Sequence, residues 1–106
     1  MAKRRIKIEI LPTAKIDLQE IVDFIAHGSR KYATLEKRLI IKAIDKLADF
    51  PNLGTQFEFR SINARQFVFR NYLIIYRFKT ESLLEVLSVH HHSRLIGNNP
   101  AFKDDE

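Results

Sequence analysis

The chain has 106 residues, 45% of them hydrophobic and 29% charged, as is typical of a single soluble globular domain. It has no cysteine, which excludes disulfides, thiolate chemistry and cysteine-based zinc sites, and no apolar run approaches the roughly 20 residues of a membrane span. A formal net charge of +5 favours acidic partners, either nucleic acid or an acidic protein segment.

The first expected element is a strand. Isoleucines at positions 6, 8 and 10 alternate with Lys7 and Glu9, and a period of two is typical of a strand with one buried face. This alternation directly follows the basic residues 3–5. Because the continuous apolar segment of a secretory signal is therefore missing, we expect a cytoplasmic protein.

Two amphipathic helices are expected next. Pro12 suits the first turn of a helix, and the apolar side chains of residues 18–25 recur at i, i+3, i+4 and i+7, which is one helical face. Gly28 suits the end of this helix, and Ser29 suits the N-cap of a second helix over about residues 30–50. Because the link is short, the helices should form an antiparallel hairpin that packs on a sheet.

The second half of the chain predicts strands. After a turn at residues 51–54, strand-like segments cover residues 57–62, 64–70, 72–78 and 83–91. Asn63 and Asn71 can supply the tight turns between the first three segments. The last two segments are apolar on both faces, which predicts a central position in the sheet.

These elements predict an α+β fold. An N-terminal strand precedes an antiparallel helical hairpin, which packs on a mostly antiparallel sheet of about four strands. The polar tail at 97–106 is expected to be loosely ordered. The positive charge should lie mainly in the second half, because residues 12–50 carry seven basic and six acidic side chains while residues 59–94 carry six and two.

Several short motifs, in a fixed order, resemble those of a known family. They are Ala14-x-x-Asp17-Leu18-x-x-Ile21, Ile44-x-x-Leu47-x-x-Phe50-Pro51-x-x-Gly54, Arg65, Tyr72-Leu73-Ile74-Ile75-Tyr76-Arg77, and Val89-His90 with Arg94. Together, over about residues 6–95, they resemble the RelE/ParE superfamily of bacterial type II toxins, closer to the ParE-like branch. The resemblance implies one toxin domain at 1–96 and a role in a toxin–antitoxin (plasmid stabilisation) module.

The resemblance leaves two mechanisms open. ParE-like members act by binding DNA gyrase, and the long helical hairpin and the Val89-His90…Arg94 ending are similar to theirs. RelE-like members are ribosome-dependent endoribonucleases that cut messenger RNA without a metal. Either kind implies a cognate antitoxin that covers the basic face, and a homodimer through the helical hairpin is an alternative partner. No cofactor is expected.

The candidate site residues follow from these two mechanisms. For a nuclease, His90 or His92 would transfer protons while Arg65 and Arg94 stabilise the phosphorane. The residues that would bind a target or phosphate are Arg65, Arg70, Tyr72, Tyr76 and Arg94.

Structural alternatives apply to several of the same residues. The two tyrosines suit core packing with hydroxyls at the rim, and Asp17 suits a backbone or arginine partner. Arg77 should pair with Glu85 on the neighbouring strand. His90 and His92 share a strand face, but two ligands do not make a zinc site.

Two departures weigh against the nuclease. Residues 54–63 contain one basic residue, Arg60, where RelE-like nucleases tend to carry a dense basic group, and no tyrosine follows His92. The sequence therefore favours a ParE-like binding toxin, with the nuclease as the alternative.

Overall fold

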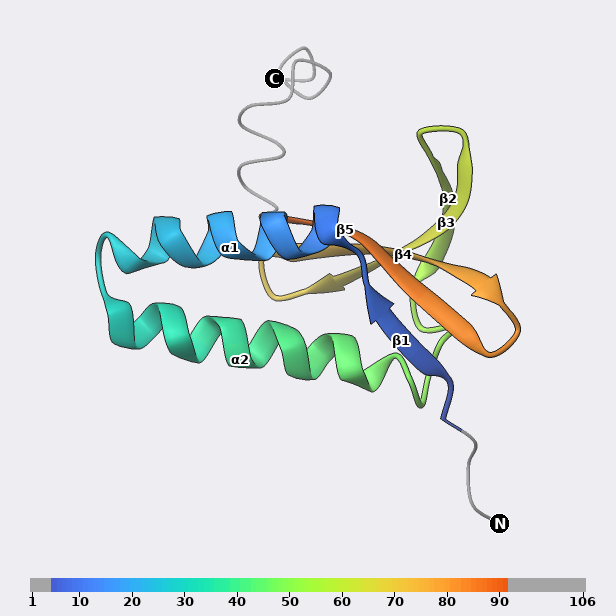
Figure 1. Cartoon of the computed structure of the whole chain (residues 1–106), viewed down its shortest axis with the longest axis horizontal. Helices are drawn as coiled ribbons and strands as arrows, with labels where there is room; N and C mark the ends of the chain where they lie inside the picture. Colours follow the sequence, from blue (N-terminus) through green and yellow to red (C-terminus); the bar gives the residue numbers. More distant parts are fainter. Residues whose placement is uncertain (1–4, 92–106) are drawn as a thin grey trace.

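The computed structural model describes residues 5–91 as two helices and a five-stranded sheet (Figure 1). The elements are β1 (Lys7–Ile10), α1 (Pro12–Ala26), α2 (Arg30–Lys46), β2 (Thr55–Phe59), β3 (Ile62–Phe69), β4 (Tyr72–Thr80) and β5 (Leu83–His91). The strand order is β1-β5-β4-β3-β2, and every neighbouring pair is antiparallel except β1 and β5. The predicted α+β fold is confirmed. None of the helices in this part of the chain is long and apolar enough to cross a membrane.

The helical hairpin begins and turns where its sequence signals lie. Pro12 opens α1, and the Ser29 side chain caps α2 by accepting a hydrogen bond of 3.1 Å from the backbone N–H of Tyr32. The expected end of α2 near Phe50 is wrong, since the α-helix ends at Lys46. The next three N–H groups bond to carbonyls three residues earlier, so the chain tightens before it leaves the helix.

Ser29→Ala should lower the free energy of unfolding by about 1 kcal/mol, because it leaves the Tyr32 N–H without its side-chain acceptor. Urea denaturation followed by circular dichroism measures the change. Ser29→Asp is the matched control, because it keeps an acceptor at the cap and should retain most of the stability. Equal losses in both variants would contradict a capping role.

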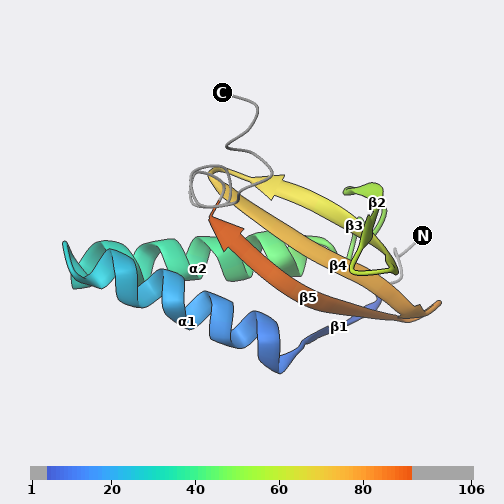
Figure 2. The same cartoon turned by 90° about the horizontal axis from the view of Figure 1, so that it is seen from above.

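The core lies between the helices and one face of the sheet. Its buried members include Leu18, Ile40, Ile44, Ile74 and Tyr76. A smaller cluster on the opposite face contains Ala64, Ile75 and Leu87. As Figure 2 shows, β5, β4 and β3 lie side by side, and the far end of the helical hairpin extends beyond them. The prediction that the last two strands are central is confirmed, since β4 and β5 are both interior.

The turns of the sheet differ from the expected ones. The turn between β2 and β3 is at Arg60 and Ser61, with φ of 51° and 66°, whereas Asn63 lies within β3 opposite Glu58. Both turn residues have positive φ, as a two-residue hairpin of type I′ requires. The turn between β3 and β4 does include Asn71, but Arg70 has the positive φ, of 55°.

Candidate functional site

His90 belongs to a hydrogen-bonded chain on β5. Its Nε2 lies 2.8 Å from the Ser88 Oγ, and the Ser88 hydroxyl donates to Asp17 Oδ2 at 2.8 Å. Because that hydroxyl has one proton, its oxygen is left to accept from His90, which places a proton on Nε2. Ser88 thus links His90 to Asp17 on α1. In this arrangement the His90 Nε2 is a hydrogen-bond donor, so it is not available as a base.

Where β1 ends, Thr13 and Asp17 supply hydrogen-bond partners for backbone groups on the edge of β5. The β1 pairing stops at Ile10 opposite Val86. Beyond it, the Thr13 hydroxyl donates to the Leu87 carbonyl at 2.8 Å, and Asp17 Oδ2 accepts from the Val89 N–H at 3.0 Å. The first turns of α1 therefore take over as the edge partner of β5. The expected backbone partner of Asp17 is confirmed.

A cavity of about 350 Å³ lies beside this network, between α1, β5 and the β2–β3 hairpin. Its lining includes Ile16, Asp17, Arg60 and His90. The Arg60 guanidinium lies 5.0 Å above the ring of Phe59, a cation–π distance that orients it on the hairpin. The lining of this cavity therefore contains both a guanidinium, from Arg60, and an imidazole, from His90.

Arg65 and Tyr76 hold the turn that follows α2. The Arg65 guanidinium donates to the carbonyl oxygens of Asn52 and Gly54. The Tyr76 hydroxyl donates to the Pro51 carbonyl at 2.8 Å and accepts from the Gly54 N–H at 2.9 Å. Burial raises the pKa of Tyr76, whose side chain has no exposed surface. Tyr76 therefore offers nothing to a target, and its hydroxyl serves the turn.

Arg70 and Tyr72 meet a buried carboxylate on α2. Glu36 is only 2% exposed, and its Oε2 accepts from the Tyr72 hydroxyl at 3.1 Å. Its Oε1 accepts no hydrogen bond but forms an ion pair with Arg70 Nη2 at 3.0 Å. The His91 ring packs edge-on against Tyr72, with ring centroids 5.3 Å apart. The exposed half of Arg70 remains open to a partner, whereas Tyr72 is buried.

Alkaline unfolding should report on Tyr72. Burial, and then the Glu36 carboxylate, raise the pKa of Tyr72 to about 12. The unfolded chain loses this proton near pH 10, so the folded state holds it more tightly. The stabilisation is complete below about pH 10 and is lost as the pH rises through 12. Denaturation midpoints across this range should fall less steeply in Tyr72→Phe, and parallel curves for both proteins would contradict the assignment.

The predicted site residues form three separate groups. Arg65 and Tyr76 lie at the 51–54 turn, Arg70 and Tyr72 lie against Glu36, and His90 lies against Ser88 and Asp17. His92 and Arg94 lie outside the described residues. Across residues 5–91, no three His, Asp or Glu side chains gather as metal ligands. The expected pair of Arg77 and Glu85 is confirmed at 3.0 Å.

Sequence reasoning missed two residues of these groups. Glu36 lies among the apolar positions of α2, three residues after Ala33 and four before Ile40, and all three are buried. A carboxylate at that spacing signals a buried polar partner. Ser88 carried no comparable signal, because a serine in a strand is ordinarily a solvent-facing residue.

Comparison with known proteins gives a consistent result. Residues 8–96 match the family model described as the ParE toxin of the type II toxin–antitoxin system parDE. Among solved structures, the fold is similar to a chromosomal ParDE toxin–antitoxin system from P. aeruginosa, with a TM-score of 0.70, 15% identity, and coverage of 83% of this chain and 97% of that chain.

A second solved structure, the toxin–antitoxin complex RelBE2 from Mycobacterium tuberculosis, has a TM-score of 0.56 and 18% identity, with coverage of 82% of this chain and 98% of that chain. Comparison with curated protein sequences gave no match. At these identities the two structures establish the fold alone. Since the family model spans most of the sequence, this chain belongs to the ParE family of toxins of type II toxin–antitoxin systems.

Proposed function

We propose that this ParE-family toxin arrests growth by binding DNA gyrase in the cytoplasm, without cutting RNA. The observation that carries the proposal is the internal use of Arg65 and Tyr76, two of the side chains that a nuclease or a phosphate site would need. Arg65 donates to the turn at 52–54, and Tyr76 is fully buried beneath it. Both therefore stabilise the fold.

Cleavage of RNA without a metal needs a base, a cation and an acid around one phosphate. Among the described residues, His90 and Arg65 belong to different groups, and the Tyr72 hydroxyl is held by Glu36. A hydroxyl whose pKa is about 12 is also a poor proton donor near neutral pH. The geometry supports recognition of a target by a folded surface better than it supports this chemistry.

A ribosome-dependent endoribonuclease is the second candidate. Arg60 and His90 line the same cavity, which brings a cation and a proton-transferring ring to one place. The fold similarity to the RelBE2 toxin–antitoxin complex also favours this candidate. His90→Ala distinguishes the two candidates, because a nuclease that uses His90 at this cavity would lose its activity while a binding toxin would keep most of it.

We further propose a cognate antitoxin as the partner that neutralises the toxin. Both similar solved structures are toxin–antitoxin systems. Large apolar side chains remain uncovered on this chain, among them Ile16 at 60% and Val68 at 55% exposure. Such surface is expected to be covered by a partner.

Controlled expression in a bacterium tests the proposed target. DNA synthesis and protein synthesis are followed separately with labelled precursors, for the natural chain and for His90→Ala. We expect DNA synthesis to stop first in both, with induction of the DNA-damage response, and purified toxin to inhibit supercoiling by gyrase. If protein synthesis stops first and His90→Ala restores it, the gyrase proposal is wrong and the nuclease is correct.

A further inference from the structure

The charges of the helical hairpin are divided between its two helices. Residues 12–50 are nearly balanced in sequence, but six of their seven basic side chains lie on α2 and all six are exposed. They are Arg30, Lys31, Lys37, Arg38, Lys42 and Lys46. The exposed acidic side chains Glu20 and Asp23 lie on α1. The near balance of the sequence therefore conceals a strongly positive helix.

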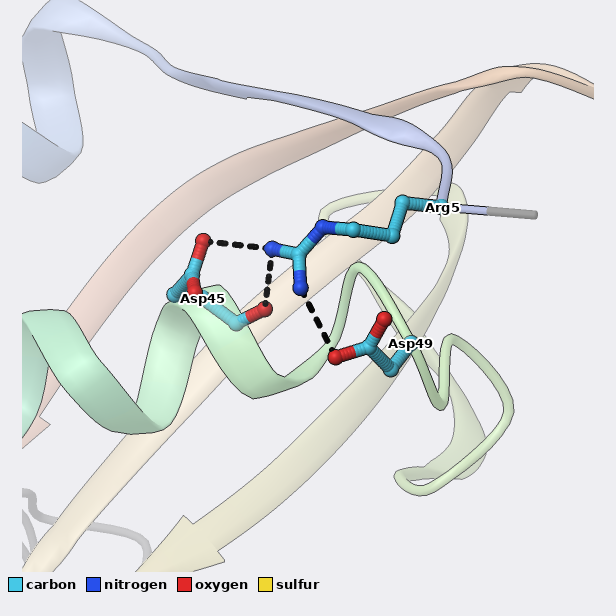
Figure 3. Close-up of polar contacts among 3 residues, drawn as sticks. All are labelled: Arg5, Asp45 and Asp49. Atoms are coloured by element: carbon cyan, nitrogen blue, oxygen red, sulfur yellow. Dashed lines mark hydrogen bonds and ion pairs between the residues drawn. The ribbon is translucent and has the colours of Figure 1, made fainter. Parts of the chain in front are cut away.

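The two acidic residues of α2 do not offset this charge. Glu36 is buried against Tyr72 and Arg70. Asp45 is paired with Arg5 at 2.8 Å, and the same guanidinium also reaches Asp49 at 2.8 Å (Figure 3). The solvent-facing side of α2 thus presents cations whose acidic neighbours are already engaged.

Four of the cations form a row along the helix. Lys31, Arg38, Lys42 and Lys46 are separated by seven, four and four residues, which places them on one side of an α-helix. From the first to the last, the row spans about 22 Å at a rise of about 1.5 Å per residue. We call these four residues the α2 row.

This arrangement works against the stability of the helix. Arg38 with Lys42, and Lys42 with Lys46, are like charges at i, i+4, a spacing at which they repel. Arg30 and Lys31 lie in the first turn, which contains no acidic residue and faces the positive end of the helix dipole. A face that only needed to be soluble would mix both signs, so the α2 row points to a polyanionic partner.

We propose that the α2 row binds the phosphate backbone of duplex DNA. Each DNA strand presents one phosphate per about 3.4 Å of axis, so a row of about 22 Å faces several phosphates at once. B-form DNA has a major groove about 12 Å wide that admits an α-helix, whereas the deep, narrow groove of A-form RNA does not. Glu20 and Asp23 repel phosphates, which orients the duplex along α2 and away from α1.

This binding of DNA goes beyond the proposed inhibition of gyrase and does not depend on it, because it is measured with DNA alone. Fluorescence anisotropy of a labelled 20-base-pair duplex is followed with the full-length chain over a series of salt concentrations. The test variant is Arg38→Gln/Lys42→Gln/Lys46→Gln. The matched control, Lys7→Gln/Lys15→Gln/Lys79→Gln, removes three exposed lysines elsewhere and has the same net charge.

The test variant should bind more weakly at low salt. Its slope of log K against log salt should become shallower by about 2.7, at about 0.9 for each phosphate that the protein no longer neutralises. The control variant should keep most of the affinity and slope. The test variant should melt at about the same temperature as the natural chain, because two repulsive pairs are gone but the negative end of the helix dipole loses the Lys46 cation.

Four outcomes would overturn the proposal. The first is an unchanged affinity of the test variant for the duplex. The second is an equal loss of affinity in the control variant, which would show that net charge alone determines binding. The third is tighter binding to a duplex RNA of the same sequence. Loss of antitoxin binding with DNA binding intact would assign the α2 row to an acidic protein instead, and would equally overturn the DNA assignment.

Discussion

Gly54→Ala should lower the free energy of unfolding by about 2–3 kcal/mol, because the turn after α2 has no space for a methyl group. A Cβ at this position would lie 2.7 Å from the Gln66 carbonyl oxygen and 2.8 Å from the Tyr76 hydroxyl. The carbonyl belongs to β3, which is paired on both sides, so it cannot move cheaply. Calorimetry should show a melting temperature lower by about 10–20 °C, at about 4–8 °C per kcal/mol.

Gly28→Ala is the control for this prediction. A Cβ at Gly28 would meet only the Ile25 carbonyl, at an ordinary 3.7 Å, so little change is expected. The double variant Gly54→Ala/Tyr76→Phe adds a second check, because removing the hydroxyl relieves one of the close approaches. Its loss should be smaller than the sum of the two single losses. Strictly additive losses would show that the Tyr76 hydroxyl does not confine residue 54.

Asp17→Ala should lower the free energy of unfolding by about 3 kcal/mol. The change removes one carboxylate that accepts from both the Val89 N–H and the Ser88 hydroxyl, and hydrogen bonds to a charged group contribute about 1.5–3 kcal/mol each. Val89 is buried, and beyond the end of β1 only α1 covers this edge of β5, so its N–H would lose its partner. Urea denaturation measures the loss, and amide hydrogen exchange should localise it to the end of β5.

Two further variants distinguish the effect of the Asp17 carboxylate from a general effect of substitutions in α1. Asp17→Asn keeps one acceptor oxygen and should lose less stability than the alanine variant. Asp23→Ala removes an exposed carboxylate of the same helix, whose side-chain hydrogen bond is to Gln19, and should change stability by less than about 0.5 kcal/mol. If Asp23→Ala were as damaging as Asp17→Ala, the edge-capping role of Asp17 would be refuted.

The fold was predictable because its signals are local. Apolar periodicity located both helices and the first strand, and Ser29 marked the start of α2. The continuous apolar runs of β4 and β5 predicted their interior positions, because a strand covered on both faces has no polar face.

The turn between β2 and β3 was predicted at the wrong residue. Asparagine tolerates positive φ, which favoured Asn63, but the register pairs Asn63 with Glu58 and Ile62 with Phe59. That register leaves Arg60 and Ser61 to turn, although neither residue type favours positive φ. Pairing along the whole strand thus outweighed the preference of one residue, which is a nonlocal effect that a turn motif does not contain.

The grouping of the candidate site residues was not predictable for a related reason. Tyr76 meets the Pro51 carbonyl 25 positions away, and Tyr72 meets Glu36 across 36 positions. The sequence identified tyrosines and arginines that could bind a phosphate or a target. Only the tertiary structure shows that most of them hydrogen-bond or pair with other residues of the chain. His90 and Arg60 also line one cavity, whose walls come from three distant segments.

The parallel pairing of β1 with β5 has a consequence for biosynthesis. Lys7 lies opposite Leu83, so within residues 5–91 the first strand pairs with the last one, and β5 also joins β1 to the rest of the sheet. A nascent chain that has not yet reached residue 83 lacks this joining strand and cannot close the sheet around its core. The growing polypeptide therefore completes this fold only after β5 has been synthesised.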